Sequence, residues 1–189
     1  MPSELIGAIS RVVERTCAAD GNVFGYGIWT HHITEVAANA RRLAPLFDAD
    51  PEIVEIAAWL HDYASVKDAA LYEEHHVHGP IEAERLLRRY DYPPEKIAAV
   101  GHAIAAHRAS VPLERRSSEA VCLANADALA HLRNVPSLLY LAYVRRGLSI
   151  DDGGRWVRAK LIRSWNKLDP RVQAEAGSDY RAALKVLPA

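Results

Sequence analysis

Four side chains that can bind a divalent metal occur along the chain in the order His, His-Asp, Asp: His32, His61, Asp62 and Asp127. The His61-Asp62 pair directly follows an apolar stretch, residues 53–60, which reads as a buried helix. Imidazole and carboxylate groups together bind Mn, Fe, Co, Ni, Mg or Zn and leave positions open for water and substrate. The set therefore predicts a divalent metal that activates water for attack on phosphorus.

These side chains lie on the inward faces of three expected helices. Val36 continues the face of His32 at helical spacing, and Leu60 leads to His61. Asp127 lies within an apolar run, where a carboxylate without a charge partner is costly, so it is expected to face a cation or several hydrogen-bond donors. A core histidine or a helix-capping aspartate explains any one residue alone. Four of them on the inward faces of three helices favour a shared site.

The elements that must position these residues are expected to be helices alone, because Gly and Pro separate helical patterns and no segment alternates convincingly as a strand. Start signals include Thr30, Asp50 followed by Pro51, and Ser117 or Ser118. The expected helices span about residues 3–19, 30–47, 51–63, 81–90, 94–108, 118–132, 136–147, 155–168 and 171–187. Residues 64–78 and 151–154 are expected to form loops, the first with at most a short helical turn.

We therefore expect an all-α fold, a helical bundle of about eight or nine helices. One domain is expected over residues 1–189, with the metal-binding motifs in about 30–132 and a C-terminal helical hairpin over about 155–187. A chain of 189 residues buries a core without disulfides, so a bound metal would be functional. Cys17 and Cys122 are expected to be small core residues.

Composition bears on partners and location. The formal net charge is -1 and no strongly basic face stands out, so a nucleic acid polymer is not expected as a partner. Residues 1–5 lack the basic flank and apolar run of a signal peptide, and no stretch reaches the length of a membrane span. These observations predict a cytoplasmic protein without a membrane partner, and they leave its oligomeric state open.

Three motifs resemble those of the HD-domain superfamily of metal-dependent phosphohydrolases. They are residues 32–37 (HITEVA), 58–62 (AWLHD) and 125–129 (NADAL), and the resemblance covers about residues 30–132. It implies that His32, His61, Asp62 and Asp127 hold a divalent metal inside a helical bundle. It also implies a substrate among phosphomonoesters, nucleotides or cyclic nucleotides, without fixing which.

A second layer resembles those superfamily members that hold two metals. They add a His ahead of a Gly that opens the next helix, and another His near the end of the helix after that. Here His75, His76 and His78 precede Gly79, and His107 ends the later helix. His75 has the spacing closest to the two-metal pattern, so the resemblance makes His75 and His107 the candidates for a second metal. The choice among the three upstream histidines stays open.

Helical periodicity distinguishes the two histidines of the expected helix 94–108. Val100, Ile104 and His107 share one stripe, whereas His102 points well away from it. We therefore expect His107 inside the site and His102 on the surface. If no second metal binds, the inward histidines would contact substrate phosphate or donate protons.

Cations and further histidines near these motifs are the candidates for binding an anionic substrate. They are Lys67 in the expected 64–78 loop, Arg108 directly after His107, and His78. His131, one helical turn beyond Asp127, could orient a ligand or contact the substrate. Solvated surface charge is the alternative for Lys67 and Arg108, and a helix-capping or surface role for His131.

The leading hypothesis is hydrolysis of a phosphate ester or anhydride, on a nucleotide or another small phosphorylated metabolite. Asp62 is the expected catalytic residue, because it or a nearby histidine could take the proton as water attacks in line. Two alternatives stay open. One is oxidative cleavage at a di-iron site, which a few superfamily members perform and which requires the second metal. The other is a non-catalytic module that binds a nucleotide as a sensor, against which the complete set of four ligands argues.

Overall fold

The computed structural model describes residues 2–108 and 113–188, and within them the chain is helical with no strand. The predicted all-α fold is confirmed. In this part of the chain, 3-10 segments (Ala44–Phe47, Ala69–Leu71 and Arg88–Tyr90) and π-helical turns (Trp29–Ile33 and Leu141–Arg145) extend or join the α-helices. The α-helices are α1 (Pro2–Cys17), α2 (Thr34–Leu43), α3 (Pro51–Leu60), α4 (Tyr63–Lys67), α5 (His75–Leu87), α6 (Pro94–Ala106), α7 (Ser118–Arg133), α8 (Val135–Tyr140), α9 (Ile150–Lys167) and α10 (Pro170–Val186).

The predicted start signals of α3 and α7 are confirmed. Asp50 caps α3, where its carboxylate accepts hydrogen bonds from two backbone amides of the first turn, at 2.9 and 3.3 Å. Ser117 caps α7 by accepting a hydrogen bond from the Ala120 amide at 3.2 Å. These caps fix where each helix begins, and hence the register in which it presents its metal-binding side chains.

The prediction of a loop over residues 64–78 is wrong for most of that span. α4 fills its first part, which adds a helix to those expected, and α5 begins at His75 rather than near residue 81. Pro80 suggested a helix start, but it lies inside α5 and leaves one backbone carbonyl without its usual helical donor. Gly79 lets α5 approach α6 closely, since a Cβ there would lie 2.7 Å from Cγ2 of Ile104. His75, His76 and His78 therefore lie on a helix that packs closely on α6, and not in a loop.

The predicted loop at residues 151–154 is also wrong, because α9 begins before it. Ser149 caps α9 by accepting a hydrogen bond from a backbone amide of the first turn at 3.1 Å. Gly153 suggested a turn, but it is a buried helical residue, and a Cβ on it would overlap the ring of Tyr143. The glycine is explained by close packing rather than by an unusual backbone conformation.

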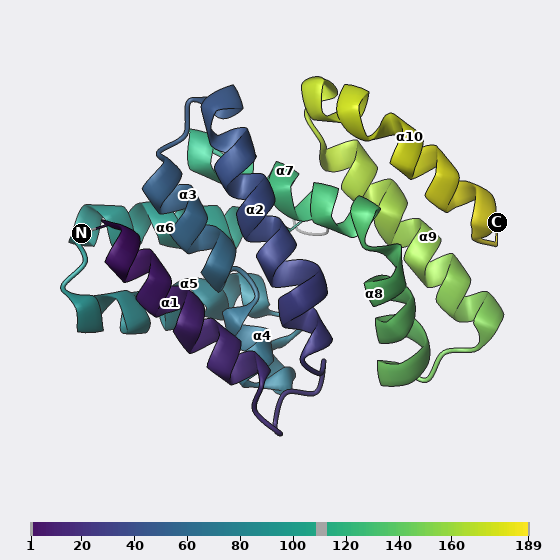
Figure 1. Ribbon diagram of the computed structural model, residues 1–189, viewed down its shortest axis with the longest axis horizontal. Coiled ribbons are helices and arrows are strands. Elements are labelled where there is room, and N and C mark those ends of the chain that lie inside the picture. The colour runs from purple at the N-terminus through teal and green to yellow at the C-terminus, as the bar shows by residue number, and fades with distance from the viewer. Residues whose placement is uncertain (1, 109–112, 189) are drawn as a thin grey trace.

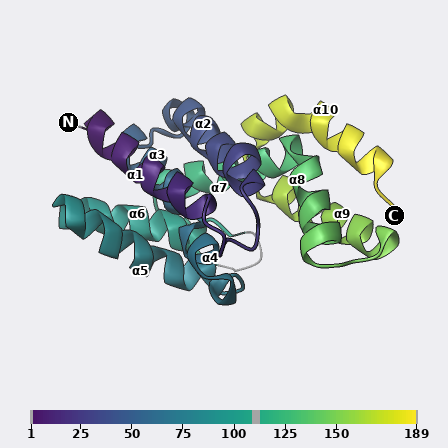
Figure 2. The same cartoon turned by 60° about the horizontal axis from the view of Figure 1, so that its bottom comes forward.

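α7 runs through the middle of the molecule, between helices of the N-terminal and C-terminal parts (Figure 1). It packs against α2, α3 and α6 on one side, and against α8, α9 and α10 on the other. Figure 2 shows the same division from another direction, with α9 and α10 forming the predicted C-terminal hairpin. Within the hairpin, Trp165 stacks on Tyr180 with ring centroids 4.3 Å apart. A residue in the middle of α7 can therefore meet groups from both parts.

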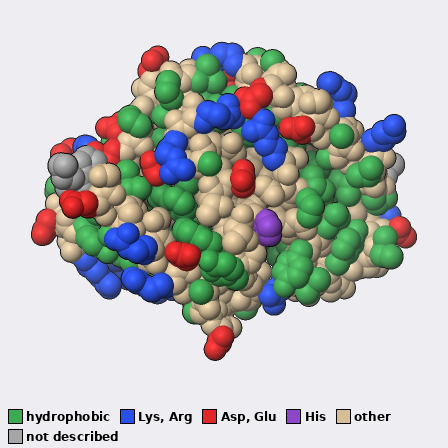
Figure 3. All heavy atoms as spheres, viewed as in Figure 1, with side chains coloured by type: hydrophobic (Ala, Val, Ile, Leu, Met, Phe, Trp, Pro, Cys, Tyr) green, Lys and Arg blue, Asp and Glu red, His purple; other side chains and the backbone are tan. Residues whose placement is uncertain are grey.

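Charges of both signs are interspersed on the face seen in Figure 3. Hydrophobic side chains gather on this face over α8 and the π-helical turn after it, where Tyr140 is 43 % and Val144 is 60 % exposed. None of the helices in the described part of the chain combines the length and apolar character that a membrane span requires.

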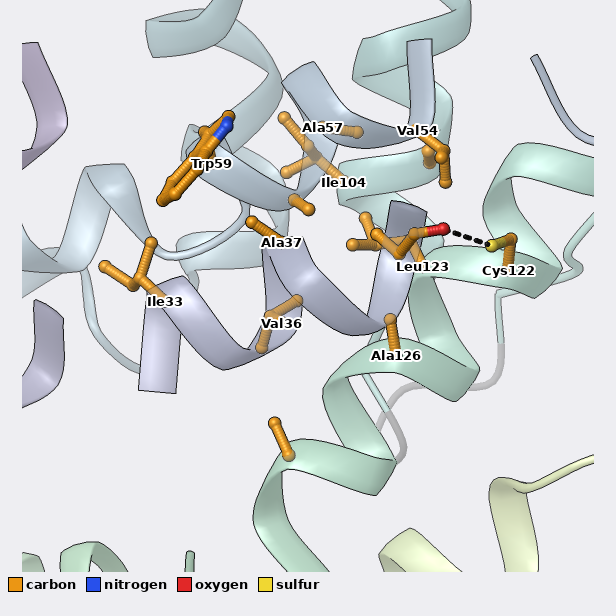
Figure 4. Packing of buried hydrophobic residues seen from close by; sticks show 14 of the residues in the cluster. Ile33, Val36, Ala37, Val54, Ala57, Trp59, Ile104, Cys122, Leu123 and Ala126 are labelled. Carbon is orange, nitrogen blue, oxygen red and sulfur yellow. Dashed lines mark hydrogen bonds between the residues drawn. The ribbon is translucent and has the colours of Figure 1, made fainter. Parts of the chain in front are cut away.

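The core beneath the site lies between α2, α3, α6 and α7, and Figure 4 shows Val36 of α2 facing the same interior as Leu123 of α7. Cys122 lies in this core with its Sγ 3.7 Å from the carbonyl oxygen of Ala40. Burial raises the pKa of the Cys122 thiol, and that of the buried Cys17 thiol, to about 12. Both cysteines are core residues, as predicted.

Gly79→Ala is expected to destabilise the fold, because the added methyl group would overlap the buried side chain of Ile104. Overpacking of this kind costs about 1–3 kcal/mol, which offsets or exceeds the gain of about 1 kcal/mol that Ala brings over Gly in a helix. The free energy of unfolding in urea, measured on metal-free protein, tests the effect.

Gly101→Ala is the matched control on the neighbouring helix α6. Its added Cβ would lie 3.5 Å from the Cβ of Pro80, an ordinary contact, so this variant should be at least as stable as the wild type. If Gly79→Ala proved as stabilising as Gly101→Ala, the close approach of α5 to α6 would be contradicted.

Candidate metal centre

The candidate ligands come from points where regular helices are interrupted or end. His32 lies in the π-helical turn Trp29–Ile33, which runs directly into α2; the predicted cap Thr30 lies inside this turn and does not begin a helix. π-helical turns are frequent at functional sites because they re-aim single side chains. His61 follows the last residue of α3, and Asp62 leaves the helical conformation at φ -106° and ψ 4°. Asp127, in contrast, lies in the middle of α7.

The first cluster brings together His32, His61 and Asp127, all buried, with Asp62 beside them. The Nε2 atom of His32 lies 3.1 Å from Nε2 of His61 and 3.6 Å from Oδ1 of Asp127. Oδ2 of Asp62 lies 3.3 Å from each of the two imidazole Nε2 atoms. All four residues of the predicted first site therefore converge.

The second cluster brings together Asp62, His75 and His107. Oδ1 of Asp62 lies 3.3 Å from Nε2 of His75, which lies 3.3 Å from Nε2 of His107. Asp62 thus turns one oxygen to each cluster. Of the alternatives left open, His76 contacts Arg108 and does not join the cluster. His102 also stays outside and accepts a hydrogen bond from a backbone amide at 3.2 Å.

Three of the imidazoles have the orientation that a metal requires. The Nδ1 atoms of His61, His75 and His107 lie 2.7, 2.6 and 2.6 Å from backbone carbonyl oxygens, to which each N–H donates. A neutral imidazole with its proton on Nδ1 presents a lone pair at Nε2. The Nε2 atoms of His75 and His107 therefore face each other at 3.3 Å, as two ligands of one cation would. This donor set fits a divalent metal ion.

Burial and charge oppose each other at the two carboxylates. Burial acts to raise the pKa of Asp62, but the facing imidazole of His61 outweighs it and holds that pKa well below its usual range. His131 and Lys167 outweigh burial in the same way and hold the pKa of Asp127 well below its usual range. The carboxylates in turn raise the pKa of His61 to about 9, although burial acts to lower it. Two ionised carboxylates, that of Asp127 buried and that of Asp62 half-buried, make the centre strongly attractive to cations.

Lys167 of α9, which the sequence did not single out, holds one oxygen of Asp127. Its Nζ donates to Oδ2 of Asp127 at 2.6 Å and to the carbonyl oxygen of His107 at 2.9 Å, and its side chain is only 3 % exposed. The other carboxylate oxygen is left facing His32. Lys160 lies seven residues earlier, on the same helix face. That spacing of two lysines on an otherwise core-facing helix is the signal that could have identified them.

A cationic cavity of about 270 Å³ opens beside the metal centre, lined by residues of both clusters and by Arg108, Arg146, Lys160, Arg163 and Lys167. Glu73 neutralises part of this charge, lying 3.5 Å from Arg108 and 3.4 Å from Arg146. The cavity suits an anionic ligand because several guanidinium and ammonium groups converge on it.

An apolar cavity of about 580 Å³ lies on the other side of the centre, between the segment preceding α2 and α8. Its apolar lining includes Phe24, Ile28, Leu138, Tyr140 and Leu141. The two cavities share a wall formed by Asp62, Tyr72, His131 and Lys160. The metal centre is thus reached from both sides.

The predicted substrate-binding residues are placed differently from one another. Arg108 lines the cationic cavity, and His131 lines both cavities with its ring stacked on His32. Lys67 lines neither, because it is held in an ion pair of 2.7 Å with Glu82. His78 also lines neither and lies 3.7 Å from a glutamate one turn earlier. The structure therefore brings Arg108 to the centre and leaves Lys67 and His78 away from it.

Comparison with solved structures finds a similar fold in Bacillus subtilis YpgQ, whose crystal structure was determined in complex with ADP. The TM-score is 0.68 at 20 % sequence identity, and the alignment covers 95 % of this chain and 92 % of that one. Comparison with curated proteins finds no match. The HD domain family model matches residues 29–132, which is more than half of the chain and includes every member of both clusters, and the chain belongs to the HD domain family.

Proposed function

We propose that this protein is a metal-dependent phosphohydrolase acting on a nucleotide or another small phosphate ester or anhydride. The observation that carries the proposal is the position of Asp62. Its two oxygens lie 3.3 Å from imidazoles of different clusters, at the wall of a cavity lined by arginines and lysines. Carboxylate and imidazole ligands beside a cationic cavity suit a phosphate group presented to divalent metals.

His32, His61, Asp62 and Asp127 would hold one divalent metal, with Mn, Fe, Co, Ni, Mg and Zn as candidates. Asp62, together with the histidines of the second cluster, would hold another. When bound, the metals supply Lewis acidity toward a phosphoryl oxygen and acidify water.

The chain's own residues orient the reactants, neutralise charge and move a proton. Arg108 and Arg146 line the cationic cavity, where they would bind non-bridging phosphate oxygens. Asp62 is the proposed catalytic residue, because it lies on the wall that both cavities share. His131 lies on the same wall, where its imidazole would be a second acceptor for the proton of the attacking water.

A nucleotide is favoured as substrate by one comparison and by one feature of the site. YpgQ, which shares the fold over nearly the whole chain, was crystallised with ADP. A diphosphate group also matches the charge of the cationic cavity. No nucleic acid polymer or membrane is part of the proposal.

A second candidate function is oxidation at a di-iron site, and the convergence of Asp62, His75 and His107 favours it, because that chemistry requires the second metal. Metal analysis after anaerobic purification separates the two: two irons with oxygen consumption favour oxidation, whereas phosphate release with Mn or Mg favours hydrolysis. A nucleotide-binding sensor module would release no phosphate from any nucleotide tested.

Asp62→Asn is expected to reduce metal binding and phosphate release together. The amide keeps the size of the side chain but removes the negative charge that both clusters share, so we expect activity to fall at least about a hundredfold. Mn content after equilibrium dialysis and phosphate release from a nucleotide panel are the two measurements.

Asp68→Asn is the matched control. Asp68 is exposed, lines neither cavity and accepts a hydrogen bond from the Ala70 amide, a role that Asn also fills. It should keep both metal content and turnover. An Asp62→Asn protein with full metal content and full turnover would contradict the proposed function.

His107→Ala is expected to lower the Mn bound at saturation from two ions per chain to one, because the variant lacks a ligand of the second cluster only. The matched control is His102→Ala, on the same helix but pointing away from His107 and outside both clusters, which should still bind two ions. A wild-type protein that binds a single Mn ion, or a His107→Ala protein that still binds two, would contradict the second site.

A further inference from the structure

The two cavities that meet at Asp62 differ in chemistry. Arg108, Arg146, Arg163 and Lys167 line the cationic cavity alone, and Lys160 is the one Lys or Arg that the described residues contribute to the apolar cavity. A phosphate group deep in the apolar cavity would lose hydration and could gain only the single ammonium of Lys160, at the shared wall, which is costly. A ring or other apolar group in the cationic cavity would cover charges that need solvent or counter-ions. The cavities therefore suit different parts of one ligand.

Tyr72 marks the boundary between them. On one side its ring packs against Phe24 of the apolar cavity, with ring centroids 5.4 Å apart. On the other side the guanidinium of Arg146, which lines the cationic cavity, lies 5.6 Å from the Tyr72 ring centroid. The change from aromatic to cationic surroundings thus occurs across a single side chain, next to the metal centre.

The apolar cavity is large enough for the organic part of a small substrate, since ligand sites commonly measure about 300–1,000 Å³ and this one measures about 580 Å³. Aromatic and aliphatic side chains line it, and aromatic faces stack well on flat rings. Figure 3 shows hydrophobic side chains gathered over α8, which carries Leu138 and Tyr140 of this lining.

We propose that the apolar cavity binds the ring-bearing organic group of the substrate, while the phosphoryl group that reacts lies at the shared wall and any further phosphates extend into the cationic cavity. This inference rests on the proposed function and narrows it. The substrate class becomes phosphate esters or anhydrides of a flat, weakly polar group, of which nucleosides are one kind. Phosphates of small, strongly polar groups are bound less well.

The test compares two phosphonates that differ only in the organic group. Benzylphosphonate and methylphosphonate carry the same anionic head and are not hydrolysed as esters. Their dissociation constants for the Mn-loaded full-length protein are measured by calorimetry. Burial of the phenyl ring should make benzylphosphonate bind at least about tenfold more tightly.

Two variants assign that difference to the apolar cavity. Tyr140→Ala removes an aromatic side chain from its lining, and Ser137→Trp places an indole at its wall. The ratio of interest is the dissociation constant of methylphosphonate divided by that of benzylphosphonate. Each variant should lower this ratio at least about threefold. Val144→Ala is the control: it lies in the π-helical turn after α8, is 60 % exposed and lines neither cavity, so the ratio should not change.

A ratio near one in the wild type, or a ratio that neither Tyr140→Ala nor Ser137→Trp changes, would overturn the inference. Circular dichroism confirms that each variant is folded before its ratio is measured. Phosphonate binding needs no turnover. The binding role of the apolar cavity and the proposed hydrolase function can therefore be contradicted separately. A protein that prefers benzylphosphonate through this cavity but releases no phosphate from any ester would contradict the proposed hydrolase and keep the binding site.

Discussion

Imidazole lone pairs and ionised carboxylates that face one another inside a protein repel. The fold must therefore hold these side chains of the candidate metal centre close together. Backbone carbonyls orient His61, His75 and His107 through their Nδ1–H groups, so each Nε2 faces inward whether or not a cation is present. Lys167 places a buried positive charge 2.6 Å from one oxygen of Asp127. That ammonium compensates part of the negative charge of the carboxylates, and the inward-facing Nε2 atoms are groups that could hold a metal.

The two halves of the molecule contribute different chemistry to this centre. Residues 29–132, which the HD domain family model matches, carry both clusters of metal-binding side chains. α9 lies beyond that match and turns one face to the cationic cavity, at spacings of three and four residues: Trp156, Lys160, Arg163, Ser164 and Lys167. α7 joins the halves, since Asp127 and His131 lie on it one turn apart. The N-terminal part thus carries side chains that could hold a metal, and the C-terminal hairpin brings lysine and arginine side chains beside them.

Helical periodicity allowed much of the centre to be predicted from the sequence. His32 and Asp127 lie on apolar stripes, and the stripe through Ile104 selected His107, which lies in a cluster, over His102, which does not. The resemblance to a known family supplied the order of the motifs and the choice of His75. These features depend on local spacing, which a sequence displays directly.

The features that the sequence did not predict depend on contacts between distant segments. α5 begins at His75 and packs closely on α6 at Gly79, whereas Pro80 locally suggests a later start. Lys167 pairs with a carboxylate 40 residues away, and nothing in its own neighbourhood indicates that partner. The two cavities likewise arise only where α8 and α9 face the ligand-bearing helices. Composition and periodicity carry little information on such pairings.

A crystal structure of the Mn-loaded protein, with anomalous scattering recorded at the manganese edge, tests directly whether the two clusters hold metal. Two anomalous peaks are expected, one on each side of the Asp62 carboxylate. Each should lie at a coordination distance of about 2.0–2.2 Å from the imidazole Nε2 atoms of its own cluster. Peaks found only elsewhere in the molecule, or no peak between these histidines at saturating Mn, would contradict it.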